Sequence, residues 1–179
     1  MTSQGVERKL TAILCADVKG YSRLMGEDEV ATLETLTAYR EVMDNLVELH
    51  HGRVVGSAGD SLLADFTSVV DAVQCAVEIQ RELKKRNAEL PEGRRMEFRI
   101  GVNLGDVIVK GDDIFGDGVN FAARLEGLAE PGGIYISGGV YEQLKNKLAL
   151  GYEFIGDKEV KNIAEPVPAF RVRLEPGAA

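Results

Sequence analysis

The run RIGVNLGDVIVKGDDIFGDGVNFAARLE, residues 99–126, contains the pattern that decides the fold of this chain. Its first half belongs to an extended, largely apolar segment at 96–110, which predicts a strand in two parts with Gly101 and Gly105 as bulges or bends. Its last residues, after the acidic and glycine-rich GDDIFGDG, are typical of a helix with a small, apolar surface. The run therefore predicts a strand, a turn and a closely packed helix in direct succession.

The predicted helix carries two polar side chains on one side. Asn120 and Arg124 are four residues apart, so they project from the same face. An arginine on a helix usually forms a surface salt bridge, and Asp117 or Glu126 offers a partner. The alternative is that a guanidinium on so tightly packed an element is presented to an anionic group such as a phosphate.

Strands and helices alternate along the rest of the chain. The expected elements are a strand at 8–16, a helix at 27–50, a hairpin at 52–66, a helix that begins after Ser68, a strand at 134–137, a helix at 140–148, and a closing strand pair at 152–160 and 166–172. The initial order βαββαβ is typical of a ferredoxin-like fold. We expect an α+β sandwich in which a largely antiparallel sheet carries its helices mainly on one face.

Composition and charge indicate one acidic domain. With 179 residues, the chain is expected to form a single domain over 1–179, ending in a tail or a truncated linker at 175–179 to which further domains would be attached. Lys and Arg total 21 against 29 Asp and Glu, and the net charge of −8 disfavours nucleic acid or an anionic membrane as a partner.

Cysteine usage and hydropathy indicate the compartment. Cys15 and Cys75 lie in apolar runs, so we expect buried, reduced thiols and a cytoplasmic location. No segment has the apolar length of a signal peptide or a membrane span. The only two histidines, His50 and His51, are adjacent at a predicted helix end, where a capping role explains them. Their adjacency weakens the hypothesis of a hydrolase that requires a separate base.

Asp17 and Asp60 are the candidate metal ligands. Asp17 ends the first predicted strand before a glycine turn, and Asp60 lies at the hairpin turn or starts its second strand. Each carboxylate alone is as well explained by turn formation. If the first strand lies beside the hairpin, however, the two carboxylates converge at one edge of the sheet and form an oxygen-rich site for Mg²⁺ or Mn²⁺. Two-metal phosphoryl transfer is one chemistry that such a site supports.

Three motifs resemble the catalytic domain of the class III nucleotidyl cyclases. They are ILCADVKGYSRLM at 13–25, AGDSLLADF at 58–66 and, most specifically, the run at 99–126. The resemblance covers roughly residues 7–174 and implies the palm-type cyclase sandwich as the fold.

The resemblance implies roles for the matching residues. Asp17 and Asp60, with the carbonyl group of Val18, would hold two Mg²⁺ or Mn²⁺ ions in each active site. The neighbouring turn, which would contact the nucleotide, comprises Val18, Lys19, Gly20 and Tyr21. Chemistry of this kind joins the ribose 3′-hydroxyl to the α-phosphate and releases pyrophosphate.

The family also implies a second set of residues and a dimer. Asn120 would orient the ribose, Arg124 would neutralise charge on the α-phosphate in the transition state, and Lys161 would bind phosphate. Members of the family pair head to tail, and each active site takes its metal ligands from one subunit and its Asn and Arg from the other. A homodimer with two interfacial sites is therefore implied.

Two positions that contact the base in related adenylyl cyclases differ in how well they match. Asp113 stands where an acidic residue would accept a hydrogen bond from the adenine 6-amino group, whereas Gly56 stands where a Lys usually donates to the ring. The segment 105–116 is also shorter than the arm with which many members embrace their partner.

The resemblance favours an adenylyl cyclase that converts ATP to 3′,5′-cyclic AMP and pyrophosphate. Because of Gly56 and the short arm, the alternative is a catalytically weak or inactive module that binds nucleotide or dimerises within a larger signalling protein. A guanylyl or diguanylate cyclase is a third hypothesis, but it does not predict Asp113, and the hairpin lacks the glycine-glycine-acidic signature of diguanylate cyclases.

Overall fold

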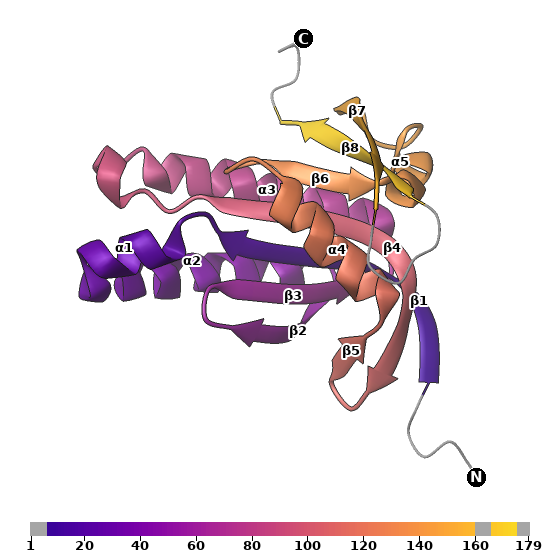
Figure 1. Ribbon diagram of the computed structural model, residues 1–179, viewed down its shortest axis with the longest axis horizontal. Helices are drawn as coiled ribbons and strands as arrows, with labels where there is room; N and C mark the ends of the chain where they lie inside the picture. Colours follow the sequence, from indigo (N-terminus) through magenta and orange to yellow (C-terminus); the bar gives the residue numbers. More distant parts are fainter. Residues whose placement is uncertain (1–6, 160–165, 175–179) are drawn as a thin grey trace.

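A computed structural model describes residues 7–159 and 166–174, and these form one eight-stranded sheet with helices on both faces (Figure 1). The strands are β1 (Glu7–Val18), β2 (Gly52–Ala58), β3 (Ser61–Phe66), β4 (Phe98–Lys110), β5 (Asp113–Phe115), β6 (Ile134–Ser137), β7 (Gly151–Lys158) and β8 (Val167–Arg173). The helices are α1 (Tyr21–Glu27), α2 (Glu29–Leu49), α3 (Val69–Asn87), the 3₁₀ turn η1 (Glu92–Arg94), α4 (Asp117–Leu128) and α5 (Gly138–Leu144).

The strand order confirms the ferredoxin-like prediction. The sheet runs β2-β3-β1-β4-β6-β8-β7, with β5 paired to β4 as a short hairpin. Every neighbouring pair is antiparallel except β4 and β6, which are parallel. The first four strands thus form the βαββαβ unit, with β1 and β3 at its centre and β4 on the side where β6 extends the sheet.

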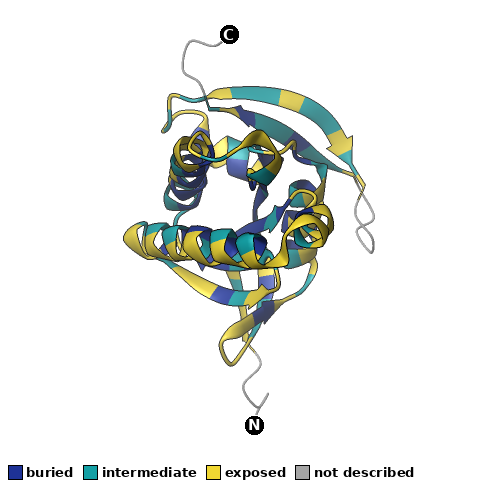
Figure 2. Ribbon diagram, turned by 90° about the vertical axis from the view of Figure 1, so that its left-hand side faces the viewer, coloured by how far each residue is buried: buried dark blue, intermediate teal, exposed yellow. Residues whose placement is uncertain are grey.

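The helices are distributed unequally over the two faces of the sheet. The main hydrophobic core joins α2, α3 and α5 to one face, as the apolar periodicity of these helices predicts. Two smaller apolar clusters lie under α4 on the opposite face, where α4 crosses the sheet (Figure 1). Figure 2 shows the buried residues on the sides of the helices that face the sheet and the exposed residues on their outer sides. Helices mainly on one face are therefore confirmed.

The predicted helix at 27–50 is confirmed as α2, and the short α1 directly precedes it. Asp28 has an extended backbone and caps α2 by accepting a hydrogen bond from the Ala31 amide at 3.0 Å, which separates α2 from the short α1. No apolar periodicity predicts α1, because this helix has only seven residues and buries only Leu24 among them. Ser68 caps α3 as predicted, through a 3.1 Å bond from the Asp71 amide.

The prediction of bulges at Gly101 and Gly105 is wrong. The pairing of β1 with β4 continues without a register shift from Glu7 opposite Val109 to Val18 opposite Phe98. A Cβ atom at Gly101 would instead clash with the backbone of α4, at the Ala122 carbonyl and the Glu126 amide. The glycine is required for the close approach of a helix and not for a break in the strand.

The remaining local predictions have mixed outcomes. Cys15 and Cys75 are buried free thiols, as expected, and burial raises the pKa of each to about 12. His50 ends α2, where its Nδ1 lies 2.8 Å from the Leu46 carbonyl oxygen, in agreement with a capping role. Lys161 and the tail at 175–179 fall outside the described residues, and the domain limits stay a prediction. Among the described residues, no helix is both long and apolar enough to cross a membrane.

Candidate active site

The hairpin turn lies against the end of β1. Because β3 pairs with β1, with Leu62 opposite Ala16, the residue before β3 is carried to the point where β1 ends. There Asp60 accepts a hydrogen bond from the Val18 amide through Oδ2 at 3.0 Å. Asp60 is therefore held beside the residue that follows Asp17, and the two carboxylates share one edge of the sheet.

Asp17 is paired with an arginine that the sequence analysis did not select. In the β1–β4 register Asp17 lies opposite Arg99. The guanidinium donates hydrogen bonds to both carboxylate oxygens, from Nε to Oδ1 at 2.9 Å and from Nη2 to Oδ2 at 2.7 Å. The Arg99 side chain also donates through Nη1 to the Gly127 carbonyl oxygen at 3.3 Å. Both members of the pair are about one-fifth exposed, so solvent screens this charge-assisted contact only in part.

Glu126 adds a third carboxylate. It lies in the last turn of α4, and its Oε2 is 4.0 Å from Nη2 of Arg99. Burial raises the pKa of Glu126 to about 8, with further contributions from a hydrogen bond to Asp17 and from the charges of Asp17 and Asp60, while Arg99 opposes the shift. Because this raised pKa keeps Glu126 largely protonated near neutral pH, the surplus negative charge at this edge comes from Asp17 and Asp60 against the single Arg99 guanidinium.

The surplus negative charge and the oxygen donors fit a divalent cation. Asp17, Asp60 and the carbonyl of Val18 offer only oxygen ligands, which Mg²⁺ and Mn²⁺ prefer. Within residues 7–159 and 166–174, no group of three or more His, Cys, Asp or Glu side chains is arranged to hold a metal ion. Water and phosphate oxygens would therefore have to complete the coordination, which is the usual way that Mg²⁺ binds at sites that act on nucleotides.

The turn that follows Val18 presents backbone to the same edge. The Lys19 amide donates to the Glu97 carbonyl oxygen at 2.9 Å, which fixes the direction of the chain as it leaves β1. Gly20 has φ of 71°, a left-handed conformation that favours glycine, and it starts α1 without a side-chain cap. Tyr21 opens α1 and packs against the main core, whereas Lys19 and Gly20 are exposed.

Asn120 and Arg124 face away from these carboxylates. Both side chains are exposed, and among the described residues neither forms a side-chain hydrogen bond or an ion pair. The surface salt bridge considered for Arg124 is therefore not found in this part of the chain, because Glu126 faces Arg99 and Asp17 instead. The predicted site residues fall into two separate sets, with no contact between them in the described structure.

Close packing fixes the position of α4. A Cβ atom at Gly118 would lie 2.7 Å from the Asp106 carbonyl oxygen, and Nδ2 of the buried Asn103 donates to the Gly118 carbonyl oxygen at 3.0 Å. Together with the approach at Gly101, these contacts leave α4 little freedom to rotate. The outward direction of its two polar side chains is consequently a property of the fold.

The two positions that the sequence predicts to contact the base lie on β5 and β2, which are not paired with each other in the sheet. Asp113 is exposed on β5, which follows a tight turn through Gly111 at φ of 62°, and Arg53 of β2 is 3.9 Å from Asp112 in that turn. Gly56 follows a register shift in β2, and a Cβ atom there would have only ordinary contacts, at 3.9 Å from Leu63. The short arm is therefore a tight hairpin, and the position of Gly56 has room for a side chain.

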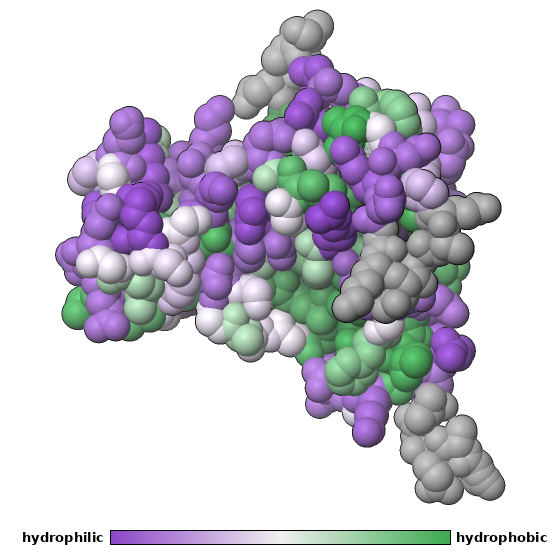
Figure 3. All heavy atoms as spheres, viewed as in Figure 1, coloured by the Kyte–Doolittle hydropathy of each residue, from purple (hydrophilic) through white to green (hydrophobic). Residues whose placement is uncertain are grey.

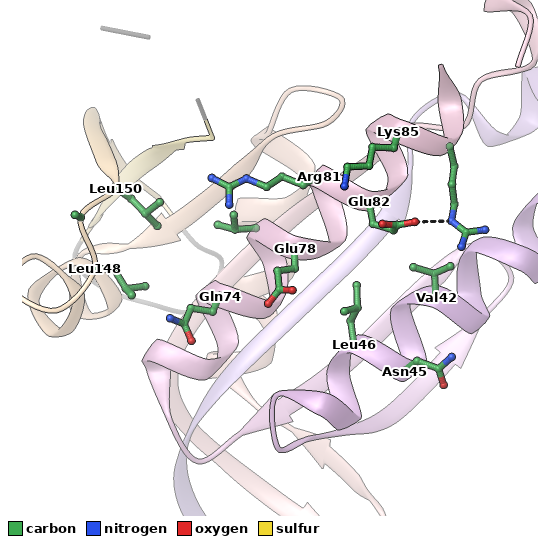
Figure 4. A pocket seen from close by; sticks show the side chains of 13 residues that line it. Val42, Asn45, Leu46, Gln74, Glu78, Arg81, Glu82, Lys85, Leu148 and Leu150 are labelled. Carbon is green, nitrogen blue, oxygen red and sulfur yellow. Dashed lines mark hydrogen bonds and ion pairs between the residues drawn. The ribbon is translucent and has the colours of Figure 1, made fainter. Parts of the chain in front are cut away.

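A pocket of about 730 Å³ lies apart from this edge, between α2, α3 and the segment 148–150 (Figure 4). It contains none of the predicted site residues, and its lining mixes apolar and charged side chains, such as Leu46, Leu150 and Arg81. Glu82 in this pocket is already paired with Arg86 at 3.0 Å. The site described above is consequently defined by its carboxylates and not by a deep cavity.

The strand order, the carboxylate edge and the outward polar pair of α4 together define a palm-type domain of the nucleotidyl cyclase class. A family model described as "Adenylate and Guanylate cyclase catalytic domain" matches residues 6–168. The chain belongs to this family.

Individual relatives agree with the family assignment. The chain is 45% identical over its whole length to "Putative adenylate cyclase 3" of Rhizobium meliloti (strain 1021), of which it covers 32%. It therefore spans about a third of the length of that relative. It also matches the crystal structure of an adenylate/guanylate cyclase/hydrolase from Silicibacter pomeroyi with a TM-score of 0.88 and 39% identity, covering 93% of this chain and 98% of that one.

A more distant structure supports the fold alone. The adenylyl cyclase CyaB from P. aeruginosa matches with a TM-score of 0.83 at 24% identity, covering 94% of this chain and 95% of that chain. Family membership thus places the carboxylate edge within a known class of catalytic domain, and the choice between adenine and guanine nucleotides is a separate question.

Proposed function

We propose that this domain is an adenylyl cyclase, which converts ATP to 3′,5′-cyclic AMP and pyrophosphate. The observation that carries the proposal is the position of Asp60 against the end of β1, which brings a second carboxylate to the edge where Asp17 lies. Asp17, Asp60 and the Val18 carbonyl would hold two Mg²⁺ or Mn²⁺ ions. These ions, when bound, acidify the ribose 3′-hydroxyl and neutralise the triphosphate.

The second set of residues would act across a homodimer. Asn120 would orient the ribose, Arg124 would stabilise the charge that develops on the α-phosphate, and Lys161 would bind phosphate. The separation of the outward-facing Asn120 and Arg124 from the carboxylate edge of the same chain supports a composite site. In a head-to-tail dimer, α4 of one subunit supplies the partner's site.

An exposed apolar area supports dimerisation. Figure 3 shows hydrophobic residues gathered around β5 and the neighbouring part of the sheet. Contiguous exposed apolar surface commonly marks a protein interface, and here it adjoins the helix that carries Asn120 and Arg124.

Asp113 supports adenine as the base. Its exposed carboxylate accepts hydrogen bonds, so it suits the 6-amino group of adenine and not the O6 acceptor of guanine. The relative from Rhizobium meliloti that matches the whole chain is named a putative adenylate cyclase, in agreement with this choice.

The proposal is tested by assaying purified protein for cyclic nucleotides with ATP or GTP, under Mg²⁺ and then Mn²⁺. We expect cyclic AMP from ATP, much less cyclic GMP from GTP, and no product from Asp60→Ala. Equal or preferred use of GTP would contradict the role of Asp113. Nucleotide binding without turnover, even at high protein concentration, would instead favour a binding or dimerisation module.

Gly56→Lys is expected to increase kcat/KM for ATP by about fivefold to tenfold. The position has room for a side chain, and a Lys there supplies a donor to a ring nitrogen that otherwise relies on water; such a hydrogen bond is worth about 1 to 1.5 kcal/mol. Gly56→Met is the matched control, with similar length but no donor. Steady-state kinetics with both variants check the prediction, and an equal gain from Met would show that packing and not hydrogen bonding is responsible.

A further inference from the structure

The Arg99 guanidinium is paired with Asp17, the carboxylate that the proposed function assigns to a metal ion. We propose that Arg99 is the resident counter-ion of Asp17 in the metal-free protein, and that Glu126 receives its guanidinium when a divalent cation takes Asp17. Glu126 is thus a positioning residue that acts on the metal site through Arg99. This inference rests on the proposed metal-dependent function.

The geometry of the metal-free pair requires such a movement. Arg99 engages both oxygens of Asp17, at 2.9 and 2.7 Å, and so occupies one lone pair on each oxygen and limits the approach of a cation to the remaining ones. A guanidinium and a divalent cation also repel each other at this distance, in a site that is only about one-fifth exposed. The cation therefore cannot bind Asp17 well until Arg99 withdraws.

Glu126 is the group toward which Arg99 can withdraw. Its Oε2 is already 4.0 Å from Nη2, and Nη1 is anchored to the Gly127 carbonyl oxygen at 3.3 Å, so a small rotation of the guanidinium toward α4 completes the new pair. Asp60 is a poor alternative, because its Oδ2 is held by the Val18 amide and the same carboxylate faces the proposed metal.

The close packing of α4 makes Glu126 a fixed acceptor. The Glu126 amide lies where a Cβ atom at Gly101 would clash, so this turn of the helix sits directly on β4, two residues from Arg99. The side chain of Glu126 is only 13% exposed, and solvent does not replace it as a partner for the displaced guanidinium. Without Glu126, Arg99 would either stay on Asp17 or be left unpaired beside the cation, and both outcomes weaken metal binding.

A double-mutant cycle on Mn²⁺ affinity tests the inference. We would titrate Mn²⁺ into nucleotide-free protein and follow free Mn²⁺ by electron paramagnetic resonance, for the wild type, Glu126→Gln, Arg99→Gln and the double variant. Glu126→Gln is expected to weaken binding about tenfold, the size typical of residues that orient metal ligands. Arg99→Gln is expected to tighten binding by a similar factor, because it frees Asp17.

The double variant gives the decisive comparison. If Glu126 acts through Arg99, its substitution should change the affinity by less than about threefold once Arg99 is absent. An equal loss in both backgrounds would make Glu126 a direct metal ligand and overturn the inference, as would no loss in either. Arg99→Lys, which keeps the charge but not the two-pronged grip, replaces Arg99→Gln if that variant does not fold.

Two outcomes separate this inference from the proposed function. A wild type that binds no Mn²⁺ would overturn both the metal-dependent cyclase and the role of Glu126. A wild type that binds Mn²⁺ and loses this binding in Asp60→Asn, but is unaffected by Glu126→Gln, would leave the proposed function intact and remove only the inference.

Discussion

Mixing two inactive variants, Asp60→Ala and Arg124→Ala, is expected to restore about a quarter of the wild-type cyclase activity. Each variant alone should lose at least about a hundredfold in kcat, because one lacks a metal ligand and the other lacks the stabilising charge on the α-phosphate. In a head-to-tail heterodimer, one of the two sites combines both lesions and the other contains neither.

The expected recovery follows from random pairing. About half of the dimers in an equimolar mixture are heterodimers, and each has one intact site of two, which gives about a quarter of full activity. Cyclic AMP formation after mixing and re-equilibration measures it. The matched control is a mixture of Asp17→Ala with Asp60→Ala, since both residues belong to the same half of the site and no combination restores it. Recovery in the control mixture, or none in the test mixture, would rule out the composite site.

Gly101→Val is expected to lower the free energy of unfolding by about 3 kcal/mol and to abolish activity. A Cβ atom at this position clashes with the backbone of α4 and lies 2.9 Å from the Leu125 Cβ, so the helix must move away from β4. Movement of α4 would open the apolar clusters beneath it and displace Asn120, Arg124 and Glu126 together. Urea denaturation followed by circular dichroism measures the change in stability.

Gly127→Ala is the matched control for this prediction. It lies on the same helix, and an added Cβ atom there meets nothing within 4 Å. Because alanine favours helix more than glycine does, this variant should be more stable than the wild type by about 0.5 kcal/mol and remain active. A loss of stability at Gly127 as large as that at Gly101 would mean that α4 tolerates no change at all, and the clash would no longer explain the effect.

Most of the fold could be predicted from the sequence because its signals are local. Ser68 caps α3 through a hydrogen bond to a residue three positions away. The buried faces of α2 and α3 can likewise be identified from apolar residues that recur about one helical turn apart. The hairpin at Asp60 has the same local character. The error at Gly101 arose because a glycine in a strand is explained equally well by a bulge and by the approach of another element, and sequence does not distinguish them.

The sequence by itself determined the elements, the family and the residue types that carry the proposed chemistry, including Asp17, Asp60 and the Asn120 and Arg124 pair. Only the tertiary structure decided which of them meet. Arg99 is 82 residues from Asp17 in the chain, and the β1–β4 register places the two opposite each other. Glu126 was considered as a partner for Arg124 and belongs to the carboxylate edge instead. Side-chain patterns record local conformation, whereas contacts of this kind depend on strand pairing and helix packing between distant segments, which no local pattern specifies.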